Sequence, residues 1–116
     1  LVRATDGGEF RSRIATVSTR KLALTLRPNR PNPFNPRTVI SYELPAALQP
    51  TRVRLLILDV AGRVVRTLVD ERQKGGVHTV EWEGRDDRGQ AVSSGVYFSV
   101  LDVDGKRRMQ KMVLLK

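Results

Sequence analysis

The chain has 116 residues, the size of one domain, and its 40% hydrophobic and 28% charged residues are ordinary for a folded globular protein. It contains no cysteine, which excludes disulfides, zinc-thiolate sites and cysteine nucleophiles. The formal net charge of +9 permits an acidic partner, but the basic residues are scattered and not interleaved with aromatic ones, so we expect no nucleic-acid surface.

Residues 1–21 differ in pattern from the rest. We expect them to be a linker or the remnant of an upstream domain, with an extra strand of the following domain, residues 22–116, as the alternative. The chain starts at Leu1 without an initiator Met or a signal-peptide pattern, which indicates a segment of a longer protein. No run of about eighteen apolar residues occurs, so we expect no transmembrane segment.

The first expected strand, 22–26, leads into a segment rich in proline and asparagine. Four prolines and all three asparagines of the chain lie within residues 28–36. Proline fixes φ and removes amide donors, while asparagine side chains can bond the backbone, so we expect an ordered turn or polyproline-like crossover. Phe34 is the only other apolar side chain of this segment, and we expect it to plug the segment onto the core.

Three further strands are expected at 37–44, 52–60 and 64–69. Pro45 ends the first of them, because proline cannot donate to a ladder. The other two form a hairpin through a tight turn at Gly62.

The next strand is expected at 77–82, with His78, Val80 and Trp82 on one face. The last two, 96–103 and 106–115, are joined by Asp104 and Gly105, a strong two-residue hairpin signal.

These short apolar runs recur about every ten to fifteen residues, and none keeps a helical period for more than two turns. The sequence therefore predicts an all-β fold, a seven-stranded antiparallel immunoglobulin-like β-sandwich.

The sequence shows no set of residues typical of a catalytic or metal site. The single His78 sits within a strand, and no second histidine is available for a metal pair. Three carboxylates in the loop 83–89 resemble a calcium site, but Asp and Gly are also turn residues, and Arg85 and Arg88 would neutralise the charge. We therefore expect no enzyme, no metal site and no cofactor.

Several segments, taken in order, resemble one known family. They are residues 31–40, 42–45, 59–65, 68–69, 76–78, 82–89, 94–98 and 111–116. This series resembles the C-terminal sorting domain of type IX secretion substrates (the Por secretion system sorting domain) and the related Ig-like domain of the flagellar hook-capping protein. The resemblance covers about residues 22–116.

The resemblance implies a non-catalytic sorting and attachment module at the C-terminal end of a larger secreted protein, on the outer-membrane exterior. An outer-membrane secretion translocon would recognise it, and a sortase-like peptidase would cut before the sandwich, near Lys21, and join the cargo to an anionic lipopolysaccharide. The recognition residues that it implies are Asn32, Pro33, Phe34, Asn35, Pro36, Gly95, Tyr97, Lys111, Met112, Val113, Leu114, Leu115 and Lys116.

The terminal strand, 111–116, would ordinarily be a core strand. It can serve recognition if it lies at a sheet edge and offers its backbone to an added strand. Two other functions remain open: an adhesion or carbohydrate-binding sandwich, and a hook-capping-type scaffold domain. Six aromatic residues in all make a sugar-binding platform hard to build.

Overall fold

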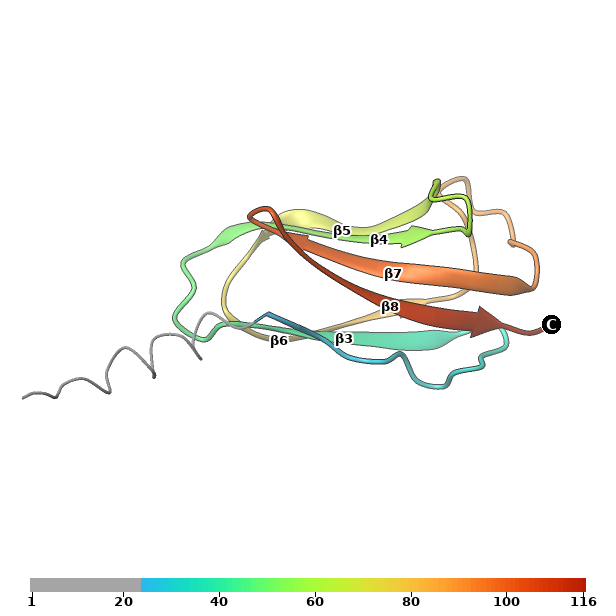
Figure 1. Cartoon of the computed structure of the whole chain (residues 1–116), viewed down its shortest axis with the longest axis horizontal. Coiled ribbons are helices and arrows are strands. Elements are labelled where there is room, and N and C mark those ends of the chain that lie inside the picture. The colour runs from blue at the N-terminus through green and yellow to red at the C-terminus, as the bar shows by residue number, and fades with distance from the viewer. Residues whose placement is uncertain (1–23) are drawn as a thin grey trace, which may run out of the picture.

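The computed structural model describes residues 24–116, so the expectation for residues 1–21 lies outside the described part of the chain. The described residues form seven strands in two antiparallel sheets that face each other (Figure 1). The three-stranded sheet has the order β2-β3-β6, and the four-stranded sheet has the order β5-β4-β7-β8. The predicted seven-stranded immunoglobulin-like sandwich is confirmed.

The strands match the expected ones with shifted ends. They are β2 (Thr25–Leu26), β3 (Thr38–Leu44), β4 (Thr51–Leu58), β5 (Val64–Gln73), β6 (Gly76–Trp82), β7 (Gly95–Val103) and β8 (Lys106–Leu114). The largest difference is at β5, which continues past the predicted end at residue 69. Its polar end, 70–73, pairs with the first half of β4, because cross-strand partners override weak intrinsic strand propensity.

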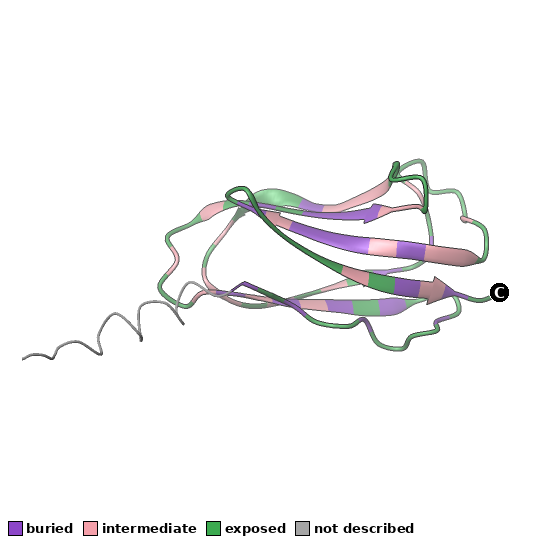
Figure 2. Cartoon of the chain, in the orientation of Figure 1, coloured by how far each residue is buried: buried purple, intermediate pink, exposed green. Residues whose placement is uncertain are grey.

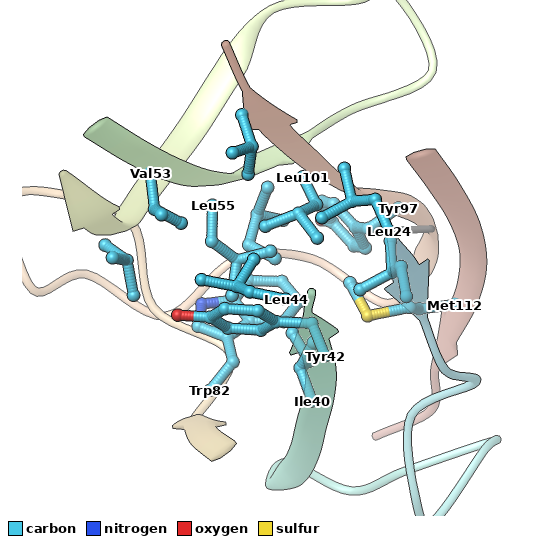
Figure 3. Packing of buried hydrophobic residues seen from close by; sticks show 14 of the residues in the cluster. Leu24, Ile40, Tyr42, Leu44, Val53, Leu55, Trp82, Tyr97, Leu101 and Met112 are labelled. Atoms are coloured by element: carbon cyan, nitrogen blue, oxygen red, sulfur yellow. The ribbon is translucent and has the colours of Figure 1, made fainter. Parts of the chain in front are cut away.

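The core lies between the two sheets. Along β3 the alternate residues Thr38, Ile40, Tyr42 and Leu44 are buried, as a strand with one solvated face requires. Figure 3 shows side chains of both sheets, including Tyr42 and Leu101, packed together in this space. Buried positions accordingly run through the middle of the strands in Figure 2, while the turns are mostly exposed.

One side of the sandwich is closed by side chains that join the two sheets. Arg108 Nε donates a hydrogen bond of 3.1 Å to the carbonyl of Leu24, and Gln110 Nε2 donates one of 3.0 Å to the carbonyl of Leu26. Because β2 and β8 are edge strands of different sheets, these two bonds satisfy backbone acceptors that would otherwise face solvent.

Local details of two predicted elements are also confirmed. Asp104 and Gly105 have φ of 51° and 79°, the pair of positive values that a type I′ hairpin turn needs. On β6, Trp82 is buried and His78 is half-buried on the same face, where the His78 ring stacks on Tyr42 with centroids 5.3 Å apart. Within residues 24–116 no helix exists that could span a membrane.

Candidate functional site

The proline-asparagine segment lies along the end of β8. The backbone N–H of Phe34 donates to the carbonyl of Val113 at 3.0 Å, and the N–H of Leu115 donates to the carbonyl of Phe34 at 2.9 Å. Phe34 thereby forms a parallel bridge with Leu114. In Figure 1 the loop that leads into β3 runs to the same end of the sandwich as the tip of β8. The segment replaces a neighbouring strand at this point.

Asn32 completes this replacement with its side chain. Its Oδ1 accepts a hydrogen bond of 3.0 Å from the N–H of Val113, and its Nδ2 donates one of 3.4 Å to the carbonyl of Lys111. β8 is the edge strand of its sheet, as the recognition hypothesis required. The backbone of residues 111–115 is nevertheless not free to pair with an added strand, because Asn32 and Phe34 already bond its outward-facing groups.

Phe34 anchors the segment to the core, as predicted. Its side chain is 2% exposed and its ring lies 5.7 Å from that of Trp82, measured between centroids. A second anchor was not predicted: Nδ2 of the buried Asn29 donates to Oγ1 of the buried Thr38 at 2.9 Å, and this hydroxyl donates to the carbonyl of Pro31 at 2.9 Å. The asparagine-rich composition was the only sequence signal for this anchor.

The strand that carries Gly95 and Tyr97 joins the same end of the domain. Gly95 is the cross-strand partner of Leu114, and Tyr97 is the partner of Met112. The Tyr97 hydroxyl donates to the carbonyl of Ser93 at 2.7 Å. Burial, and less strongly the negative charge of Asp59, raises the pKa of Tyr97 above its ordinary value.

The Tyr97 ring meets Trp82 edge-on, with centroids 5.4 Å apart. Trp82 therefore contacts both Phe34 and Tyr97, and one aromatic cluster supports the proline-asparagine segment and the β7–β8 pair. We call the joined set, residues 32–36, 95–97 and 111–116, the composite surface.

The members of the composite surface differ in what they can touch. Phe34, Tyr97, Met112 and Leu114 are buried, Gly95, Val96 and Val113 are half-buried, and the others are exposed: Asn32, Pro33, Asn35, Pro36, Lys111, Leu115 and Lys116. A hollow of about 300 Å³ opens beside them, with Pro36, Arg85 and Lys116 in its lining. The accessible part is thus a rigid, proline-bounded surface with amide and ammonium groups.

Two of the three carboxylates of the loop 83–89 bond to backbone N–H groups. Asp86 Oδ1 accepts hydrogen bonds of 2.9 Å from the N–H groups of Arg88 and Gln90, which shapes the turn. Asp87 Oδ1 accepts one of 2.9 Å from the N–H of Thr67 on the edge of β5. Among residues 24–116, no three histidine, aspartate or glutamate side chains come together as a metal site would need.

Comparison with solved structures gives matches to this fold at low identity. PorZ, a surface component of the type IX secretion system of Porphyromonas gingivalis, matches with 22% identity and a TM-score of 0.50, over 81% of this chain and 12% of its own. Dimeric latent PorU of the same organism matches with 18% identity and a TM-score of 0.63, over 80% of this chain and 9% of its own.

The fold also occurs in an unrelated setting. The DNA glycosylase AlkC of Pseudomonas fluorescens, solved bound to DNA, matches with 19% identity and a TM-score of 0.52, over 80% of this chain and 30% of its own. The chain thus spans about a tenth of the length of PorZ and PorU and less than a third of AlkC. These likenesses show the fold alone.

Sequence comparison is more specific. No curated protein matches the chain. The family model described as the FlgD Ig-like domain matches residues 36–105, which is more than half of the 116 residues. This match includes β3 to β7 and the loops between them. The chain therefore belongs to the FlgD Ig-like domain family.

Proposed function

We propose that the chain is a non-catalytic C-terminal sorting and cell-surface attachment module of a larger secreted protein. The observation that carries this proposal is the bonding of Asn32 to Lys111 and Val113, which makes one surface of the two segments proposed for recognition. A sorting signal must present groups in fixed positions, since immobilising a flexible segment on binding costs affinity. The composite surface meets this requirement.

The covering of β8 by Asn32 and Phe34 changes how a partner would recognise the terminal strand. Because the edge of β8 is covered at residues 111–115, a translocon would contact the exposed side chains of the composite surface and would not add a strand there. Asn35, Lys111 and Lys116 are the polar side chains available for this contact. The buried residues Phe34 and Tyr97 hold the surface in shape.

The fold shared with PorZ and PorU supports a type IX setting, since PorZ is a surface component of that system. In this proposal the partners are an outer-membrane secretion translocon, a sortase-like peptidase that cuts before the sandwich, and an anionic lipopolysaccharide on the outer-membrane exterior. A net charge of +9 favours contact with lipopolysaccharide phosphates.

A fusion experiment tests the proposal. A reporter carrying residues 22–116 should reach the surface of a type IX-competent host, and deletion of residues 112–116 should abolish this. The deletion also removes two fully buried side chains, so a folded variant is needed. The double substitution Lys111→Glu and Lys116→Glu alters only exposed side chains and should reduce surface display at least about tenfold, with unchanged unfolding.

The matched control is Lys74→Glu, which changes an exposed lysine outside the composite surface. It should be displayed as well as the unaltered fusion. Normal export of both the truncated and the double-substituted fusion would contradict the proposal.

Family membership favours one alternative, a hook-capping-type scaffold domain that assembles protein subunits. Ordered self-assembly of the purified chain, together with a fusion that is never displayed at the cell surface, would favour the scaffold function over sorting. The carbohydrate-binding alternative has less support, because Phe34, Tyr42, Trp82 and Tyr97 all point into the core.

A further inference from the structure

The outer face of the four-stranded sheet carries apolar side chains where a solvated face ordinarily carries polar ones. Leu56 and Leu58 lie on this face of β4, directly opposite Val100 and Phe98 of β7. An antiparallel sheet with one solvated face usually alternates cleanly between apolar and polar residues. This half of β4 and β7 does not alternate.

Two cross-strand rows form a continuous patch. One row joins Val64, Leu58 and Phe98, and the next joins Leu56, Val100 and Met109. We call these six residues the outer patch. Leu56 and Val100 are 4% and 1% exposed although neither belongs to the contiguous core cluster, whereas Val64 and Met109 are 53% and 57% exposed. The outer patch is a second apolar cluster whose margins are open.

The charged side chains beside the outer patch indicate which sign of charge a binding partner should carry. Asp70 and Asp102 are paired with Arg52 at 2.6 Å and with Arg107 at 3.4 Å. Arg54 lies on the same face between Asp70 and Asp102, and Lys111 lies there opposite Phe98; neither forms an ion pair with any residue of 24–116, so basic side chains outnumber these two carboxylates. The uncompensated charges are therefore positive. A second copy laid on this face would bring like charges together.

The size of the outer patch limits what can cover it. Each row crosses three strands about 4.8 Å apart, and the two rows lie about 7 Å apart, which gives a plan area of roughly 200 Å². A standard interface between two folded proteins uses about 800 Å² on each side. A single helix about 10 Å wide covers such a patch with about four turns of about 5.4 Å each. We propose that the outer patch binds an amphipathic, acidic helix of a partner protein.

The test uses the full 116-residue chain, labelled with ¹⁵N, and synthetic peptides of about 18 residues, which is about five helical turns. The first peptide places leucine on one helical face and glutamate on the flanks. The second is a scramble of the same composition, and the third replaces glutamate with lysine. Only the first should shift the amide resonances of Leu56, Phe98, Val100 and Met109 saturably, with a Kd of about 10–500 μM. The other two should bind at least about tenfold more weakly.

Two matched substitutions locate the site. Met109→Glu places a carboxylate on the outer patch at a position exposed enough for the fold to tolerate it, and it should weaken the first peptide at least about tenfold. Val77→Glu makes the same kind of change on the outer face of the other sheet, where Val77 is 62% exposed, and should change the affinity less than about twofold.

Several outcomes would overturn the inference. Absence of saturable binding up to about 1 mM would mean that the outer patch does not take such a helix. Equal binding of the scrambled peptide would mean that helical amphipathicity is irrelevant. Self-association of the chain that Met109→Glu abolishes would show that a second copy covers the outer patch instead.

Discussion

The side chain of Asn32 and the backbone N–H of Val113 are joined by a hydrogen bond of 3.0 Å across 81 positions of sequence. Asn32→Ala removes this acceptor and leaves the N–H of Val113 and the carbonyl of Lys111 without their Asn32 partner. We expect the free energy of unfolding to fall by about 1–2 kcal/mol, the usual cost of an unmade bond to a backbone group. Urea denaturation at neutral pH measures it. Asn35→Ala is the control and should change stability by less than about 0.5 kcal/mol, because Asn35 is exposed.

Truncation of Phe34 should be more costly. Phe34→Ala empties a buried site against Trp82, and we expect a loss of about 3–5 kcal/mol. The substitution should also loosen the hydrogen bonds between the Phe34 backbone and residues Val113 and Leu115. Hydrogen exchange at the amide of Leu115 should therefore accelerate more than at amides in the middle of β4. Leu115→Ala, at a side chain 51% exposed, is the comparison and should be mild. Unchanged exchange at Leu115 would show that these backbone hydrogen bonds do not depend on the Phe34 side chain.

Alanine substitution at two glycines should destabilise the fold for different reasons. At Gly105 a new Cβ meets nothing within 4 Å, so only the φ of 79° is unfavourable, and Gly105→Ala should cost about 1–2 kcal/mol. At Gly75 the same atom would collide with the carbonyl oxygen of Pro45, and the loops must move apart. Gly75→Ala should therefore lower the midpoint of thermal unfolding more than Gly105→Ala does. The reverse order would contradict the packing of these loops.

Acid should destabilise the domain through two carboxylates, the half-buried Asp59 and the exposed Asp70. Hydrogen bonds from the Arg63 N–H to Asp59, and from the Arg52 guanidinium to Asp70, hold the pKa of each carboxyl below its ordinary value. A lowered folded-state pKa stabilises the fold above the unfolded value of about 3.9, and this stabilisation is lost as pH falls through the folded value.

The unfolding free energy, measured by urea denaturation, should therefore decline as pH falls from about 5 to about 3. Asp59→Asn keeps an oxygen that can accept the backbone N–H bonds of Ala61 and Arg63 but cannot ionise. Its pH dependence should be shallower than that of the unaltered chain. An identical slope would assign the effect to other carboxylates.

The local features of the fold were predictable from the sequence, because each follows from neighbouring residues. Residues 37–44 form a strand as predicted, with the alternate residues Ile40 and Tyr42 buried, and Asp104 with Gly105 specified a hairpin whose backbone angles are those observed. The same reasoning failed for the end of β5, where polar residues form a strand only because β4 supplies partners. Propensity describes a residue in isolation, and pairing depends on the partner.

The composite surface was predictable only in part. Its segments were identified from their order in the chain, but the covering of β8 by Asn32 and Phe34 joins positions about eighty residues apart. Nothing local to either segment specifies that contact. The burial of Leu56 and Val100 on the outer face was missed for a related reason: a continuous apolar run in a strand does not say which of its faces is covered.

The bonds from Arg108 and Gln110 to the carbonyls of Leu24 and Leu26, each spanning 84 positions, bear on how the domain folds during synthesis. A chain emerging from the ribosome presents β2 long before β8, so β2 can pair with β3 early but these two bonds must wait for β8. Contacts at such separation are slow to form, because their loop-closure entropy is lost before they are made. The side of the sandwich between β2 and β8 therefore stays open until β8 has been synthesised.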